Sequence, residues 1–272
     1  MIEAATFWLR VAAGLYAVGL LHSLLVAVRQ GQSAFGVALN AFRLAVVLHG
    51  VAIIDLGLAS GHIPVDNFYQ TLSLCAFLIA FSFVVTEKRY RFGGASVALF
   101  PLVFGMVLVS ALENPMTPSQ NEGFRGALLV VHILLVLAGY AALFFTALSA
   151  LAYLTQERRL KSKQGSALLE RLPPLATLDN MLTKSLGLGF AFLTLGLIFA
   201  LMWAFLYSND SWIGNPSITI SIFTWALLLI MMFLRQSAGW RGRKAAMMAL
   251  AVLGCSALTW VTHLGLESTL TP

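Results

Sequence analysis

Charged residues are scarce in this sequence of 272 residues: Asp, Glu, Lys and Arg together make up only 10% of the chain. A soluble globular domain carries about 25% charged residues. Hydrophobic residues, in contrast, make up 59% of the chain. This composition excludes an ordinary soluble domain and indicates an integral membrane protein.

The sequence also lacks the motifs that mark soluble enzymes. It contains no GxxxxGK[ST], GxSxG or HExxH pattern, which excludes the common phosphate-binding, serine-hydrolase and metalloprotease sites. Its two cysteines, Cys75 and Cys255, do not form a CxxC pair, so no cysteine-based redox or metal site is expected. We therefore predict that the chain is not an enzyme and that it acts in or at the membrane.

Long apolar runs are what the sequence has instead. A helix needs about 20 apolar residues to cross the hydrocarbon core, and such runs must be helical because lipid cannot satisfy backbone hydrogen bonds. No connection is long enough for a second folded unit, so one integral membrane domain is expected over residues 1–272. The predicted fold is an all-α, polytopic transmembrane bundle of eight helices. The predicted spans are 4–28, 42–60, 68–86, 92–111, 126–155, 184–207, 216–234 and 245–266.

The basic residues are distributed unevenly over the predicted connections. Of the 17 Lys and Arg residues, all but Arg10 and Arg125 lie in or next to the first, third, fifth and seventh connections. The positive-inside rule then places these four connections in the cytoplasm and both termini on the periplasmic side. Basic loops beside anionic lipids also account for the net charge of +6, so no nucleic-acid partner is expected.

Ionisable side chains inside a membrane span are costly and mark candidate functional sites. No Asp, Glu, Lys or Arg lies near the middle of a predicted span, which disfavours a proton-coupled transporter. Four of the five histidines do lie in spans, His132 and His263 at an outer level and His22 and His49 at an inner level. Two imidazoles at one level can share a haem iron, whereas hydrogen bonds between helices would explain single histidines equally well.

A set of segments carries a further pattern. In chain order they are NFYQTLSLCAFLIAFSFVVTE from Asn67, VHILLVLAGYAALFFTALSALAYL from Val131, LPPLATLDNMLTKSLGLGFAFLTLGLIFALMWA from Leu172 and GWRGRK from Gly239. This ordered set resembles the CcsA, CcmC and HemX group of cytochrome c assembly proteins. The last segment is most similar to the HemX-like or YpjD-like branch.

The resemblance implies a multi-pass protein of the bacterial inner membrane that binds or presents haem near the periplasmic face. By position, His132 and His263 correspond to the two outer histidines of the group, which makes them the implied iron ligands. His49 corresponds to its first membrane histidine. The implied partners are haem, membrane lipids and other cytochrome c maturation proteins. The expected cofactor-binding residues are His132, His263, Trp212, Trp260, Tyr207 and His49, of which the first two are metal ligands.

The sequence departs from the group's pattern in two places. The tryptophan-rich outer loop is reduced to SNDSWIGNPSITISIFTW, from Ser208, and the end of the seventh span, MMFLRQ, has no histidine. These departures keep two alternatives open: a membrane scaffold or regulatory protein that has lost the haem site, and a small-molecule or lipid transporter.

Overall fold

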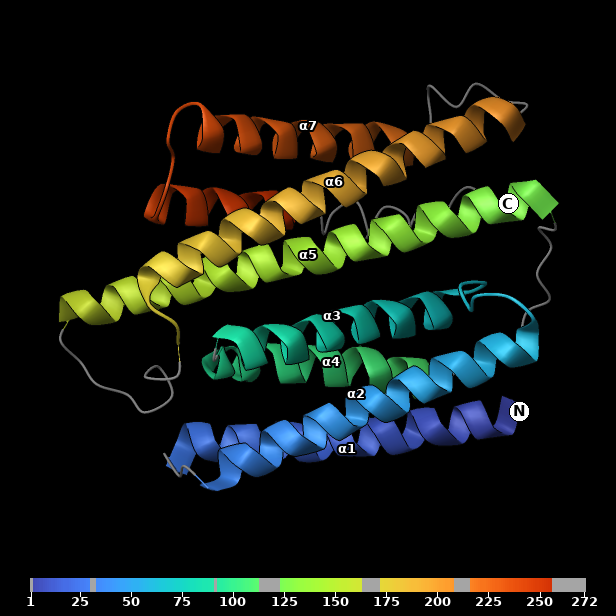
Figure 1. Ribbon diagram of the computed structural model, residues 1–272, viewed down its shortest axis with the longest axis horizontal. Coiled ribbons are helices and arrows are strands. Elements are labelled where there is room, and N and C mark those ends of the chain that lie inside the picture. Colours follow the sequence, from blue (N-terminus) through green and yellow to red (C-terminus); the bar gives the residue numbers. More distant parts are fainter. Residues whose placement is uncertain are drawn as a thin grey trace. The chain divides into compact units, whose positions relative to one another are not determined.

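The computed structural model describes residues 2–29, 33–90, 92–112, 123–162, 172–207 and 216–255. The described residues form long helices and no β-strand, with a further helical segment at 243–255 (Figure 1). A short 3-10 turn, Gly93–Ala95, leads into α4. The long helices are α1 (Ile2–Arg29), α2 (Ser33–Ser60), α3 (Phe68–Tyr90), α4 (Ser96–Leu112), α5 (Gly123–Ser162), α6 (Leu175–Tyr207) and α7 (Pro216–Gln236).

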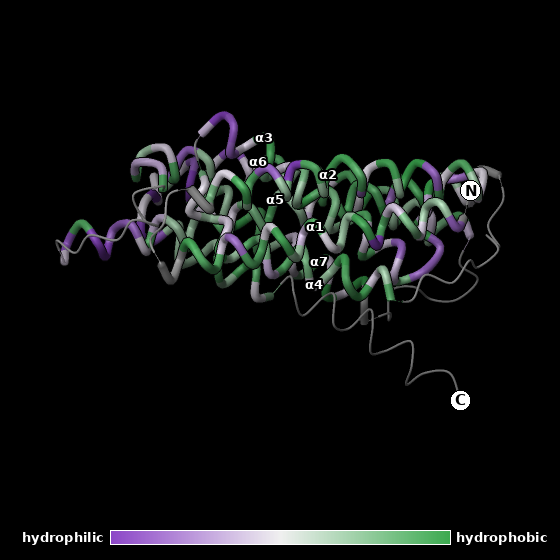
Figure 2. The backbone as a smooth tube through the Cα atoms, turned by 90° about the horizontal axis from the view of Figure 1, so that it is seen from below, coloured by the Kyte–Doolittle hydropathy of each residue, from purple (hydrophilic) through white to green (hydrophobic). Residues whose placement is uncertain are grey.

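Within the described residues, seven helices are long and apolar enough to cross a membrane. Figure 2 shows hydrophobic residues over most of the length of these helices. Large apolar side chains also lie on helix surfaces, such as Leu112 at 71% exposed and Phe205 at 77%, as expected for side chains that face lipid. The chain is therefore a multi-pass membrane protein, and the predicted all-α bundle of eight helices is confirmed. The periplasmic location of both termini stays a prediction.

Several helices extend beyond the predicted spans. α2 begins at Ser33 instead of residue 42, and α6 begins at Leu175 instead of residue 184. Hydropathy marks only the part of a helix that lies in hydrocarbon, whereas backbone hydrogen bonding continues into the polar residues on either side. The eighth predicted span, 245–266, lies partly outside the described residues, and its part up to residue 255 is helical.

The chain divides into two compact units. The first comprises residues 1–120 and 159–173, and the second comprises residues 121–158 and 174–272. α1 to α4 belong to the first unit, while α6, α7, most of α5 and the final helical segment belong to the second. The single integral membrane domain over 1–272 stays a prediction.

Aromatic rings hold the first unit together. α1 packs along α2 and α4, and α3 packs along α4 (Figure 1). Each of these helices contributes one fully buried ring to the centre: Tyr16, Phe42, Phe83 and Phe100. Phe42 stacks on Phe100 with ring centroids 4.1 Å apart, and Tyr16 meets Phe42 edge to face at 5.0 Å. Such pairs add to the hydrophobic gain from burying the rings, so this cluster fixes how the four helices pack.

In the second unit, α5 and α6 approach each other closely because glycines line their contact. A Cβ atom added to Gly139 would lie only 2.6 Å from Cγ of Leu193. A Cβ added to Gly196 would lie 2.9 Å from Cγ2 of Val136. Small residues allow this kind of backbone approach between membrane helices. This contact brings His132 on α5 within hydrogen-bond distance of α6.

Candidate functional site

His132 lies on α5 and makes a hydrogen bond to α6. Its Nδ1 is 2.9 Å from the carbonyl oxygen of Gly196. A carbonyl oxygen can only accept, so Nδ1 carries the proton and donates it. In the neutral ring the lone pair is then on Nε2, because only one of the two nitrogens is protonated. An imidazole that donates from one nitrogen to a backbone carbonyl, with its lone pair on the other, is the usual form of a metal-bound histidine.

Aromatic side chains follow along α6 toward its C-terminal end. Trp203 comes seven residues after Gly196, which places it on the same face about 10 Å further along the helix. The ring of Tyr207, at the end of α6, is 6.5 Å from that of Trp203 and tilted by 48°. Tyr207 is among the residues predicted from the sequence, whereas Trp203 is not. The signal in the sequence that could have identified Trp203 is its position seven residues after Gly196, on the same face of the helix.

Three of the expected haem contacts lie outside the described residues: His263, Trp212 and Trp260. Their role in binding haem together with His132 therefore stays a prediction. Among the described residues there is no group of three or more His, Cys, Asp or Glu that could hold a metal ion. Haem needs no such cluster, because the porphyrin supplies four ligands and the protein only the axial ones.

His49 occupies a different kind of site, in the first unit. It is fully buried, with Nδ1 3.4 Å from the Tyr16 hydroxyl and Nε2 2.8 Å from the Ser73 hydroxyl. These contacts link α2 to α1 and α3. His22 has a separate partner, since its Nδ1 lies 2.9 Å from the carbonyl oxygen of Val18 in the same helix. In this arrangement His49 connects three helices, and both of its ring nitrogens have polar neighbours.

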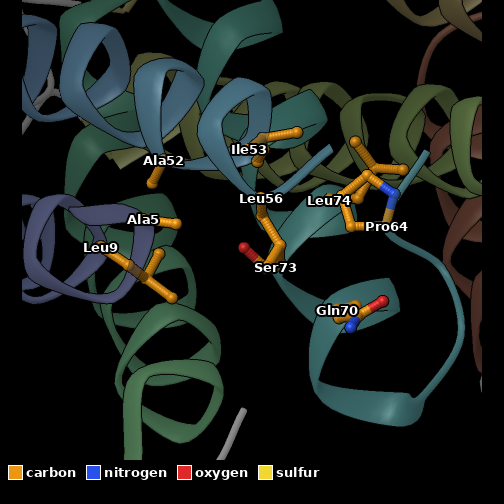
Figure 3. A pocket seen from close by; sticks show the side chains of 9 residues that line it. All are labelled: Ala5, Leu9, Ala52, Ile53, Leu56, Pro64, Gln70, Ser73 and Leu74. Atoms are coloured by element: carbon orange, nitrogen blue, oxygen red, sulfur yellow. The ribbon is translucent and has the colours of Figure 1, made fainter. Parts of the chain in front are cut away.

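A small pocket lies next to this connection (Figure 3). It has room for about one water molecule. Ser73, which contacts His49, and Gln70 provide its polar lining. The remaining lining residues are Ala5, Leu9, Ala52, Ile53, Leu56, Pro64 and Leu74. A pocket of this size does not accommodate a porphyrin.

A buried ion pair lies at the end of α7, in the second unit. The Arg235 side chain is 6% exposed, and its Nη2 is 3.0 Å from Oδ1 of Asp179 on α6. Its Nε donates to the Thr183 hydroxyl at 3.0 Å. The same Asp179 oxygen accepts from the backbone N–H of Gly242 at 3.2 Å, directly before the final helical segment. Arg235 follows directly after the seventh predicted span, 216–234, but in the structure it belongs to the last turn of α7. It joins α7 to α6, and Asp179 in turn connects α6 to the start of the final helical segment.

Comparison with known proteins identifies the family. Residues 37–270 match the family model described as cytochrome C assembly protein. The chain belongs to this family. A cytochrome c biogenesis protein CcsA of Chlorella vulgaris is 26% identical over 269 residues, covering 87% of this chain and 82% of its own length. A CcsA of Synechococcus elongatus is 26% identical over 255 residues, covering 77% of this chain and 78% of its own length.

A solved structure titled cytochrome c haem lyase CcmF has the same fold. Its TM-score is 0.70 at 16% identity, and the match covers 93% of this chain but 46% of the solved chain. This chain therefore spans just under half the length of that protein. The predicted relation to cytochrome c assembly proteins is confirmed and supports a role in haem handling, while the HemX-like or YpjD-like branch stays a prediction.

The prediction that the chain is not an enzyme is wrong. The same fold occurs in a protein titled a haem lyase, which is the name of an enzyme. The prediction failed because it relied on missing motifs for nucleophilic and hydrolytic catalysis. Where a cofactor or prosthetic group carries the reactive chemistry, the protein contributes binding and orientation, and these leave no such motif in the sequence.

Proposed function

We propose that this chain holds haem at the outer end of its second unit, near the periplasmic face of a bacterial inner membrane, and positions it for attachment to cytochrome c. His132, through Nε2, and His263 would be the two residues that bind the haem iron. The observation that carries this proposal is the hydrogen bond from Nδ1 of His132 to Gly196, because it puts the lone pair of the ring on Nε2, the nitrogen that would bind iron.

The surroundings of His132 fit this role. Trp203 and Tyr207 lie further along α6 and offer flat apolar surface to a porphyrin. Bound haem would supply the iron and the ring that a cytochrome receives. The chain's own residues would hold it in place and orient it. Membrane lipids and other cytochrome c maturation proteins are the proposed partners.

A visible spectrum of the protein purified in mild detergent tests the proposal. We expect a Soret band that His132→Ala weakens or shifts, because the variant removes a proposed iron ligand. His22→Ala is the matched control, since His22 also contacts a carbonyl through Nδ1 but lies on α1 in the other unit. A haem-free protein that still supports cytochrome c assembly would favour a scaffold, and equal spectra for the two variants would reject His132 as a ligand.

A further inference from the structure

We propose that Gly196 is the positioning residue for His132. Its carbonyl oxygen takes the Nδ1 proton, and the absence of a side chain lets α5 come close enough for that bond to form. The role in haem binding rests on the function proposed above, whereas the control of the histidine proton rests on the contact itself.

The contact leaves little room at Gly196. An added Cβ would lie 2.9 Å from Cγ2 of Val136, 3.5 Å from the backbone nitrogen of Val136 and 3.7 Å from Cβ of Leu135. Only the first distance is too short for ordinary packing, and it involves a side chain rather than backbone. An alanine here must therefore displace Val136 or move the two helices apart.

The hydrogen bond is sensitive to such a movement. Nδ1 and the Gly196 oxygen are 2.9 Å apart. A donor and acceptor separated by more than about 3.5 Å no longer form a hydrogen bond. A shift of well under one ångström along this direction therefore breaks the contact. Val136 lies one helical turn from His132 on α5, so it transmits the displacement directly to the ring.

The other glycines of the contact have a different role. Gly139 and Gly189 set the approach of α5 and α6 further from His132, where a Cβ added to Gly189 would lie 3.3 Å from the Gly139 carbonyl oxygen. Gly196 alone of these three supplies both the space and the acceptor of the Nδ1 proton. The distinction makes Gly196 a position where a small change alters the chemistry of the histidine as well as the packing.

Loss of the Gly196 acceptor should change which nitrogen of His132 is available to bind iron. With no carbonyl to hold the proton on Nδ1, the proton can move to Nε2, which must be unprotonated to bind iron. An imidazole that donates from Nδ1 is also more basic and favours ferric iron. Without the bond, haem affinity should fall by about ten- to a hundredfold, the usual effect of losing such a partner. The midpoint potential of the haem should shift upward.

The experiment uses the full chain with isotopically labelled histidine and no haem. Nitrogen NMR reports which ring nitrogen of His132 carries the proton, with His132→Gln assigning the signal. We expect the Nδ1–H form in the natural protein and its loss in Gly196→Ala. Gly187→Ala is the matched control on the same helix, because a Cβ there has no atom within 4 Å and should change nothing.

A compensating variant distinguishes loss of the hydrogen bond from misfolding of Gly196→Ala. Val136→Ala removes the methyl group that an alanine at 196 would meet, so the double variant Gly196→Ala with Val136→Ala should restore the Nδ1–H signal, the haem affinity and the potential. Restoration supports the proposal. An unchanged signal in Gly196→Ala, or a double variant that remains as impaired as the single one, would overturn it.

The two proposals fail in different ways. If the NMR signal responds as expected but the natural protein binds no haem, the haem function fails and the control of His132 by Gly196 stands. If haem binds through His132 while Gly196→Ala leaves the signal, affinity and potential unchanged, the haem function stands and the role of Gly196 is refuted.

Discussion

Removal of the Asp179 carboxylate should destabilise the second unit strongly. In the folded protein this carboxylate pairs with Arg235, which is only 6% exposed, and accepts the backbone N–H of Gly242. Asp179→Ala leaves a buried guanidinium without its counter-charge and a helix start without its acceptor. Breaking a buried ion pair by removing one partner costs about 3–5 kcal/mol.

The contacts that remain in Asp179→Ala determine where in this range the loss of unfolding free energy should lie. Arg235 still donates to the Asp179 backbone carbonyl at 2.9 Å and to the Thr183 hydroxyl at 3.0 Å. Asp179 itself is 20% exposed, so water can reach part of the vacated space. We therefore expect a loss of about 3 kcal/mol, at the lower end of the range. Asp179→Asn should lose less, because its side-chain oxygen can still accept from Gly242.

Reversible unfolding in detergent, followed by the loss of helical circular dichroism, measures these values. The comparison variant is Glu87→Gln, which breaks the 2.7 Å ion pair with Arg43. Because the Arg43 side chain is 40% exposed, this pair should contribute at most about 1 kcal/mol. Adding Arg235→Met to Asp179→Ala should recover part of the loss, since the unpaired charge is removed. Equal losses for Asp179→Ala and Glu87→Gln, or a further loss in the double variant, would refute the reasoning.

Two further predictions concern the first unit and the topology. Ser73→Ala removes the hydroxyl 2.8 Å from Nε2 of His49, so the free energy of unfolding should fall by about 1–3 kcal/mol. The haem spectrum should stay unchanged. A changed spectrum would instead make His49 part of the haem site. In a chain freed of Cys75 and Cys255, single cysteines replacing Ile63 and Lys161 should react with impermeant reagents from opposite sides of the membrane. Labelling of both from one side would contradict the predicted orientation.

The helical membrane class could be read from the sequence because hydrocarbon leaves a long apolar run no alternative to a helix. The limits of α2 and α6 could not, since hydropathy says nothing about polar turns beyond the membrane. The absence of catalytic motifs was also misleading. Such motifs indicate reactive side chains, whereas a protein that binds and orients a group with its own chemistry needs none of them.

The candidate site was partly visible in the sequence. A histidine in an apolar run is costly, and this cost is enough to make His132 a candidate. The sequence by itself thus determined the class of protein and named His132 as a candidate ligand, a role that stays a prediction. The tertiary structure alone decided which nitrogen of His132 carries the proton, by placing it against a carbonyl 64 residues away. It likewise buried Arg235 against Asp179. Hydropathy depends on local composition, whereas tautomers and ion pairs depend on which distant atoms the packing of helices brings into contact.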